Sequence, residues 1–181
     1  MKLGKGLLFL VPAVAAGATA LLIAPGSEAG AVQRRAARGS LCAADEVVIY
    51  QCGIGPQLVA VCGSRTPTPH AQYRFGTPGH VALAFPGPGQ SGGLTYAREM
   101  YSGGGALQIR FSNGGHDYAV YSRTVRTGFG SDGRNNPQFS DGVMVRRGGR
   151  LVSNRSCTTE VGGDGQPEDY MPEGAILEFP D

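Results

Sequence analysis

The side chains that could take part in catalysis are few and scattered along the 181-residue chain. Three histidines are present, His70, His80 and His116, and only His116 stands beside a carboxylate, that of Asp117. Both are expected on a strand, where neighbours point to opposite faces, so they cannot form an acid–base dyad. A serine nucleophile is often carried on a G-x-S-x-G elbow, which is missing here, and Ser102 beside a run of glycines is the nearest substitute. The sequence therefore predicts no catalytic residue.

Sites for a metal, a phosphate or a cofactor are indicated just as weakly. The segment 128–142 holds four oxygen donors, but their spacing matches no EF-hand loop and Arg134 lies among them. The glycines at 103–105 are not followed by the helix, lysine and hydroxyl residue of a phosphate-binding loop. We therefore expect an ordinary turn-rich loop at 128–142, with no metal and no cofactor. The four oxygen donors are Asp132, Asn135, Asn136 and Asp141.

The four cysteines predict two disulfides, because the start of the chain reads as an export signal. Two strands are expected on either side of a four-residue loop at 53–56, which puts Cys52 and Cys62 on opposite faces. A bond from Cys42 to Cys52 would have to close a segment that spans roughly 33 Å when extended. Geometry therefore favours Cys42 with Cys62 and Cys52 with Cys157 among the three connectivities. Catalytic or metal-binding thiols are not supported, since there is no C-x-x-C pair.

Tyrosine and arginine recur in the centre of the chain and could form one aromatic and cationic face. Such a face would suit glycans or an anionic polymer, because the rings offer flat contact area and guanidinium groups pair with anions. Tyrosine on a half-buried sheet needs no ligand, so a purely structural role is the alternative. The candidate binding residues are Tyr96, Arg98, Tyr101, Arg110, Tyr121 and Arg123.

Charge is distributed unevenly along the chain. The segment from Val32 to Cys157 has 14 arginines and six acidic residues, a net charge of +8. The segment from Thr158 to Asp181 has seven acidic residues and no basic one. The acidic tail could fold back over the basic body, the basic body could serve an anionic partner, or both could be solvated. Composition leaves these three alternatives open.

The segment 1–31 is expected to be a signal peptide. Two lysines precede a long apolar run, and the small residues at 29–31 fit a cleavage site after Ala31. Retention of the apolar run as an anchor is the alternative, although Pro12 and the many alanines and glycines disfavour a stable span. A basic arm at 32–41 follows. We expect a secreted or periplasmic protein without a stable membrane span after cleavage.

Alternating apolar residues on either side of Asn113-Gly114 predict a central β-hairpin. Both central residues of a type I′ turn need positive φ, which asparagine tolerates and glycine takes freely. A turn at this position pairs Arg110 with Asp117. A turn at Gly114-Gly115 keeps the same residues on the apolar face but loses that charge pairing, so the charges favour the first register. The expected apolar face has Leu107, Ile109 and Phe111 opposite Val120, Tyr118 and His116.

Further short strands are expected along the rest of the chain. Residues 94–101 fit a strand or a helix, and we favour a strand because glycines and the central hairpin follow directly. A second two-residue turn is expected at Gly148-Gly149, with Val145 facing Val152. About eight strands then form one all-β domain at 42–157, either an antiparallel barrel or a sandwich.

The C-terminal tail at 158–181 is expected to be acidic and flexible. Its one apolar run, Ala175 to Phe179, could dock as an edge strand.

Several segments together resemble a family of small exported bacterial β-proteins of uncharacterised function. The resemblance covers about two thirds of the chain, implies export and a β-rich fold, and carries no activity or catalytic residue. The acidic tail and the loop at 128–142 depart from the pattern, so a role placed there would be specific to this chain. The layout also resembles periplasmic β-barrel inhibitors of lysozyme at the level of the fold alone. The matching segments are Cys42, Cys52, Cys62, YRFGTPG at 73–79, YSGGG at 101–105, FSNG at 111–114, YAVY at 118–121 and Cys157.

These observations favour a non-enzymatic envelope or secreted binding module. Its arginine-rich face would contact an anionic polymer or another protein, such as a lysozyme, and no nucleic acid partner is expected. The alternative is a secreted hydrolase built on Ser102, His116 or the loop carboxylates.

Overall fold

The computed structural model of the chain describes residues 39–88, 90 and 93–180. The expected signal peptide and most of the expected basic arm lie outside these residues. Within the described ranges, no helix is long and apolar enough to cross a membrane.

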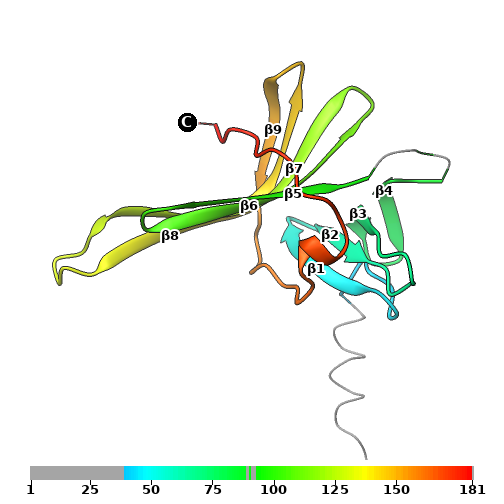
Figure 1. Ribbon diagram of the computed structural model, residues 1–181, viewed down its shortest axis with the longest axis horizontal. Helices are drawn as coiled ribbons and strands as arrows, with labels where there is room; N and C mark the ends of the chain where they lie inside the picture. Colours follow the sequence, from blue (N-terminus) through cyan, green and yellow to red (C-terminus); the bar gives the residue numbers. More distant parts are fainter. Residues whose placement is uncertain (1–38, 89, 91–92, 181) are drawn as a thin grey trace, which may run out of the picture.

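In the described part of the chain, nine strands form two antiparallel sheets that pack face to face as a sandwich (Figure 1). The all-β prediction is confirmed, but the sheets do not close into a barrel. The first sheet contains β1 (Val47–Ile54), β2 (Gln57–Gly63), β3 (Ala71–Thr77) and β4 (His80–Phe85) in that order. The second contains β5 (Thr95–Tyr101), β6 (Gly104–Asn113), β7 (His116–Phe129), β8 (Asn135–Arg147) and β9 (Arg150–Ser156). Figure 1 shows that the second sheet extends well past the first, with the β7–β8 hairpin reaching furthest.

The core lies between the inward faces of the two sheets, as the alternation of apolar residues predicts. Ile109, Phe111 and Val120 are all buried there. The rings of Phe111 and Tyr118 stack with centroids 4.6 Å apart, and Phe85 from the first sheet stacks on Phe111 at 4.7 Å. Each fully buried apolar side chain contributes roughly 1.5–3 kcal/mol, so this contact layer fixes how the sheets face each other.

Both disulfides have the connectivity that the geometry of the sequence favours. Cys42 bonds to Cys62, and Cys52 bonds to Cys157. The second bond spans 105 residues and ties the end of β9 to the first sheet. This bond also fixes the position at which the C-terminal tail begins, because the tail follows Cys157 directly.

The central hairpin turns at Gly114-Gly115, so the register predicted from Asn113-Gly114 is wrong by one position. Asn113 pairs with His116, and both turn glycines have positive φ, 58° and 74°. The expected Arg110–Asp117 pairing is lost; Arg110 instead pairs with Ala119 in the ladder. The apolar face is unchanged, because both registers put the same residues inward.

Three other local expectations need correction. The first hairpin has a two-residue turn, since Ile54 pairs with Gln57, in place of the four-residue loop at 53–56. The region 128–142 is mostly strand, because the β7–β8 ladder continues outward almost to the hairpin tip. In the last hairpin, a register shift after Val145 puts Val145 opposite Ser153 instead of Val152. Such a bulge flips the faces of the strand that follows it.

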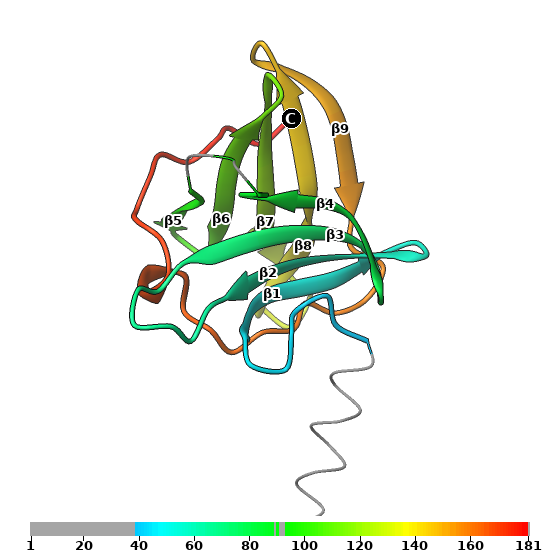
Figure 2. The same cartoon turned by 90° about the vertical axis from the view of Figure 1, so that its right-hand side faces the viewer.

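The C-terminal tail is not a free extension of the fold, contrary to the expectation of flexibility. Gly162 exchanges two backbone hydrogen bonds with Gln51 on the edge of β1, at 2.7 and 2.8 Å. A short 3-10 helix, η1 (Pro167–Asp169), follows, and the chain then crosses the edge of β5 beside Tyr96. Figure 2 shows this path around one side of the sandwich, in orange and red.

Candidate functional site

The six candidate binding residues are divided between the two faces of the second sheet. Tyr96 and Arg98 take inward-facing positions on β5, whereas Tyr101 on the same strand faces outward, because successive side chains alternate. The prediction of one aromatic and cationic face is therefore wrong. The outward set is Tyr101, Arg110, Tyr121 and Arg123.

The outward face is covered by the end of the C-terminal tail. Leu177 and Phe179 pack against a small buried cluster of Ala119, Tyr121 and Met144 on β7 and β8. The apolar run 175–179 thus docks on the face of the sheet and not as an edge strand. We call this surface the tail face; it consists of the outward side chains of β6, β7 and β8 that contact residues 175–179.

Gln108 holds the tail by its backbone. This side chain is completely buried, its Nε2 donates to the Leu177 carbonyl at 2.7 Å, and its Oε1 accepts from the Leu177 amide at 2.7 Å. The amide group thereby satisfies both backbone groups of one tail residue, as a neighbouring strand would. Sequence reasoning missed this contact. The available signal was a glutamine at an outward position between apolar residues, and its partner lies 69 residues away.

Arginines of the tail face donate to tail carbonyls and form no ion pair with the carboxylates of the described tail residues. Arg110 donates to the carbonyl of Ala175, and Arg146 donates to the carbonyl of Glu178 at 2.6 Å. Burial lowers the pKa of Arg110, and the nearby Asp117 carboxylate opposes this effect. These guanidinium groups therefore satisfy carbonyls of an irregular segment that has no strand partner of its own.

The ring of Phe179 is the second anchor of the tail. The Arg123 guanidinium lies 4.6 Å from its centroid, and Tyr121 meets it edge-on at 5.4 Å. The Tyr121 hydroxyl donates to Asn154 Oδ1 at 3.0 Å. Burial raises the pKa of Tyr121, an effect that the hydrogen bond to Asn154 partly offsets.

On β5, the tail contacts both remaining candidates. The Tyr96 amide donates to Pro172 O at 3.1 Å, and the Gly174 amide donates to Tyr96 O at 2.7 Å. Arg98 forms an ion pair with Glu168 at 3.0 Å. Five of the six candidate residues thus contact the chain's own tail, so the acidic tail does fold back over the basic body.

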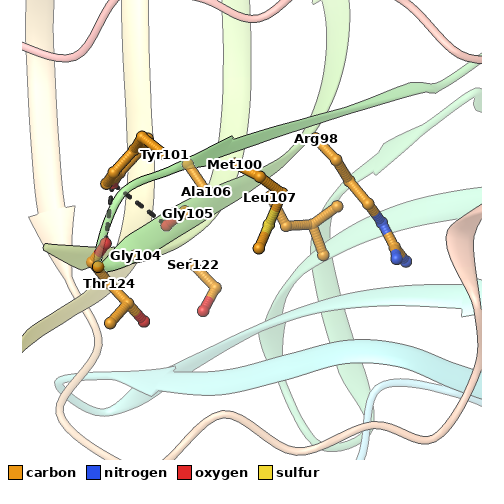
Figure 3. A pocket seen from close by; sticks show the side chains of 10 residues that line it. Arg98, Met100, Tyr101, Gly104, Gly105, Ala106, Leu107, Ser122 and Thr124 are labelled. Carbon is orange, nitrogen blue, oxygen red and sulfur yellow. Dashed lines mark hydrogen bonds between the residues drawn. The ribbon is translucent and has the colours of Figure 1, made fainter.

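Tyr101, the sixth candidate, borders an open trough of about 730 Å³ on the second sheet (Figure 3). Its hydroxyl donates to the carbonyls of Thr124 and Gly105, at 2.8 and 3.3 Å. The ring lies over Gly104, where a Cβ would come within 2.9 Å of it and 2.0 Å of Thr124 O. Gly104 therefore allows close packing at this strand end.

A row of inward-facing residues that the first sheet does not cover begins in the trough and continues past it to Phe139, which does not line the trough. Met100 pairs with Gly105, Gly105 with Thr124, and Thr124 with Phe139, so the row crosses four strands. The two large apolar side chains at its ends are strongly exposed, Met100 at 82% and Phe139 at 69%. Figure 3 shows Met100, Leu107 and Ser122 projecting from the same side of the sheet. We call this surface the trough row: Met100, Gly105, Thr124 and Phe139.

The catalytic candidates named from the sequence do not converge. His116 Nδ1 contacts only the Gly114 carbonyl, at 3.0 Å, and Ser102 sits in the turn between β5 and β6. A pair that the sequence did not suggest is Ser64 Oγ and His70 Nδ1, 2.9 Å apart. This contact closes an exposed loop, where Ser64 also donates its amide to His70 O, and no carboxylate among the described residues orients the imidazole.

Asp132 and one further cluster that could hold a metal are engaged in other interactions. Asp132 Oδ1 accepts from the Arg134 amide at 3.0 Å within the β7–β8 turn. Cys42, Glu46 and Cys62 also lie close together, but the two sulfurs are bonded to each other and Glu46 forms an ion pair with Arg74 at 2.6 Å.

Comparisons with protein-family models, with curated proteins and with solved structures found no match.

Proposed function

We propose that the protein is an exported binding module without catalytic activity, and that its partner is another protein that docks on the trough row. The observation that carries the proposal is the exposure of Met100 and Phe139 on one uncovered row that crosses four strands. Exposed apolar side chains that share a surface, bordered by polar groups, are typical of protein interaction sites. The neighbouring row supplies the polar border, with Arg98, Ser122 and Asp141.

A protein partner fits better than an anionic polymer. Polymer binding depends on arginines that are free to pair with repeated anionic groups. On the tail face, Arg110, Arg123 and Arg146 are already engaged by the tail. The trough row carries two large exposed apolar side chains and no charged one, and it lies where the second sheet extends past the first, so it offers contact area and not charge (Figure 1).

Two observations support export. The two disulfides are consistent with an oxidising, extracellular environment. The sequence of residues 1–31 has the pattern of a cleavable signal. Identifying the partner would also show where the exported protein acts.

Photo-crosslinking in the producing cell tests the proposal directly. A photoreactive residue is placed at Met100, at Phe139 or, as a control, at Val152, which is 55% exposed on β9 away from the trough row. We expect the first two positions to capture the same protein and Val152 not to. Absence of a shared product, or the same products at all three positions, would show that the trough row is not a docking site.

Two purified probes then separate the kinds of partner. A c-type lysozyme is the first protein to test, because of the fold-level resemblance noted for the sequence. Binding that is lost in Met100→Asp would support a site on the trough row. Retention on heparin at physiological salt that Met100→Asp leaves unchanged, without protein capture, would replace the protein partner by a polymer.

A further inference from the structure

A second opening, separate from the trough, is lined by residues of β3 and β4 from the first sheet and of β8 and β9 from the second. It has a volume of about 260 Å³ and is lined by side chains from both sheets. Most of its wall is apolar or aromatic, with Tyr73 and Phe75 on one side and Tyr118 and Val145 on the other. No tail residue lines the opening, so it is not part of the tail face.

The polar part of this wall comes from β9. The bulge after Val145 puts Ser153 and Arg155 at inward-facing positions, opposite Val145 and Val143. Asn154 between them faces outward, where Tyr121 donates to it. Without the bulge, Val152 and Asn154 would face inward, and the guanidinium group would lie on the other side of the sheet.

Arg155 stands at the mouth of the cavity without a carboxylate partner. Its guanidinium carbon lies 5.8 Å from the Phe75 ring centroid, and its Nη2 lies 3.5 Å from the Ile54 carbonyl, at the limit of a hydrogen bond. No described carboxylate comes within ion-pair distance of it. The cavity therefore presents an uncompensated positive charge beside an apolar interior.

Two tyrosine hydroxyls add hydrogen-bonding capacity inside the opening. Tyr73 is 97% buried, being 3% exposed, and neither its hydroxyl nor that of Tyr118 has a hydrogen-bond partner among the described residues. Burial raises the pKa of Tyr73, the neighbouring Tyr118 raises it further, and Arg155 lowers it. All three groups are thus close enough to act on one bound molecule.

We propose that this cavity binds a small anionic amphiphile, with its hydrocarbon body between the sheets and its carboxylate on Arg155. An apolar pocket with a few convergent polar groups is the usual form of a small-molecule site. Typical pockets of this kind measure roughly 300–1,000 Å³, so the ligand here is small. Guanidinium is the group that best matches a carboxylate, since it can donate two parallel hydrogen bonds.

An inward charge on an edge strand also has a second use, because it blocks pairing with another chain. That use requires only the charge of Arg155. It does not require an open volume behind the charge, walled by apolar and aromatic side chains of both sheets, and such a volume is present.

Calorimetry with three probes that share one hydrocarbon body tests the proposal on the purified, oxidised protein. The probes are octanoate, octan-1-ol and octylamine. We expect octanoate to bind most tightly and octylamine most weakly. Arg155→Gln should weaken octanoate about five- to tenfold and leave octan-1-ol unchanged, since a partly exposed guanidinium–carboxylate pair has that strength. The matched control is Arg150→Gln, at the start of the same strand and away from the cavity, which should change neither.

Filling the cavity gives the second test. Val145→Phe should abolish binding of octanoate and octan-1-ol, and Ser153→Leu, which adds bulk from the edge strand, serves if the first variant fails to fold. Undiminished octanoate binding in a folded filling variant would overturn the proposal. So would no octanoate binding at millimolar concentration, or equal losses in Arg155→Gln and Arg150→Gln. Met100→Asp should leave octanoate binding intact, so failure of this site and failure of the trough row are distinguishable.

Discussion

The tail closes the outward face of the five-stranded sheet, whereas the trough row on its inward face, beyond the first sheet, is open. The tail face has Gln108, Arg110 and Tyr121, and each of them contacts residues 175–179. The trough row has Met100 and Phe139, and both are exposed to solvent. Arginine and tyrosine therefore belong to the tail face, which the chain's own tail covers. The trough row, which stays open, instead has apolar side chains at exposed positions.

This difference has a simple physical origin. A guanidinium or amide group on a sheet can satisfy a backbone carbonyl as well as a ligand, and a tail anchored by a disulfide reaches the sheet at high effective concentration. The Cys52–Cys157 bond fixes the start of the tail beside the first sheet. An external polymer would have to displace this tail before it met the same arginines.

Replacing Gln108 by leucine should give the largest effect among the changes that separate the two faces. The variant leaves the amide and carbonyl of Leu177 without partners, and two hydrogen bonds at roughly 1 kcal/mol each predict a loss of about 2 kcal/mol. Denaturant unfolding measures it. In a chain truncated after Glu173, the free energies of unfolding with glutamine and with leucine at position 108 should differ little, because Leu177 is then absent. The matched control is Gln138→Leu, an exposed position on β8, which should change stability by less than about 0.5 kcal/mol.

Gln108→Leu could instead lower the free energy of unfolding by the same amount with and without the tail. Gln108 would then stabilise the sheet itself, and its hydrogen bonds to Leu177 would not explain its burial.

An aspartate placed on each face should change the stability by different amounts. Leu177→Asp puts a charge into the apolar cluster under the tail and should lower the free energy of unfolding by about 1.5 kcal/mol. Met100→Asp, at a position 82% exposed, should change it by less than about 0.5 kcal/mol. Thermal unfolding of the two variants side by side gives the comparison. A large loss in Met100→Asp would mean that the trough row is packed against something within the protein, and would remove the basis for a docking site.

Removal of residues 174–181 should turn the tail face into a polyanion site. Three arginines lose their tail contacts, and each one that pairs with an anionic group steepens the dependence of log affinity on log salt by roughly 0.9. We therefore expect the slope for heparin to steepen by about two to three. Arg123→Gln in the truncated chain should make the slope for heparin shallower again by about one. An unchanged slope would mean that these arginines are not what limits polymer binding in the full chain.

The sequence predicted the sandwich better than it predicted the site, because the two depend on different kinds of information. Alternation identified Ile109, Phe111 and Val120 as core residues, and this assignment survives a one-residue error in the turn. That error arose from pairing Arg110 with Asp117. The actual partner of Arg110 is a tail carbonyl 65 residues away, which no local pattern encodes.

The other errors have the same cause. The bulge after Val145 is invisible in an alternating sequence, yet it decides that Arg155 and not Asn154 faces the core. The division of Tyr96 and Tyr101 between two faces follows from strand alternation once β5 is known to be a strand. Similarly, the exposure of Met100 depends on how far the second sheet extends past the first, which is a property of the assembled sandwich and not of any single strand.

Tyrosine titration gives the smallest effect and the most local test of the comparison. Burial raises the pKa of Tyr121 on the tail face and of Tyr73 in the cavity between the sheets. An unfolded tyrosine titrates near pH 10, and the folded groups hold their protons to higher pH. The stability linked to this difference is therefore fully present below about pH 10 and is lost as the pH rises through the folded pKa values.

Removal of residues 174–181 should lower the pKa of Tyr121 towards its ordinary value and leave Tyr73 unchanged, since only Tyr121 contacts Phe179. Absorbance titration of the full and truncated chains, each compared with its Tyr121→Phe variant, isolates the shift. Equal movement of both tyrosines would mean that the tail stabilises the whole sandwich and does not simply cover one face.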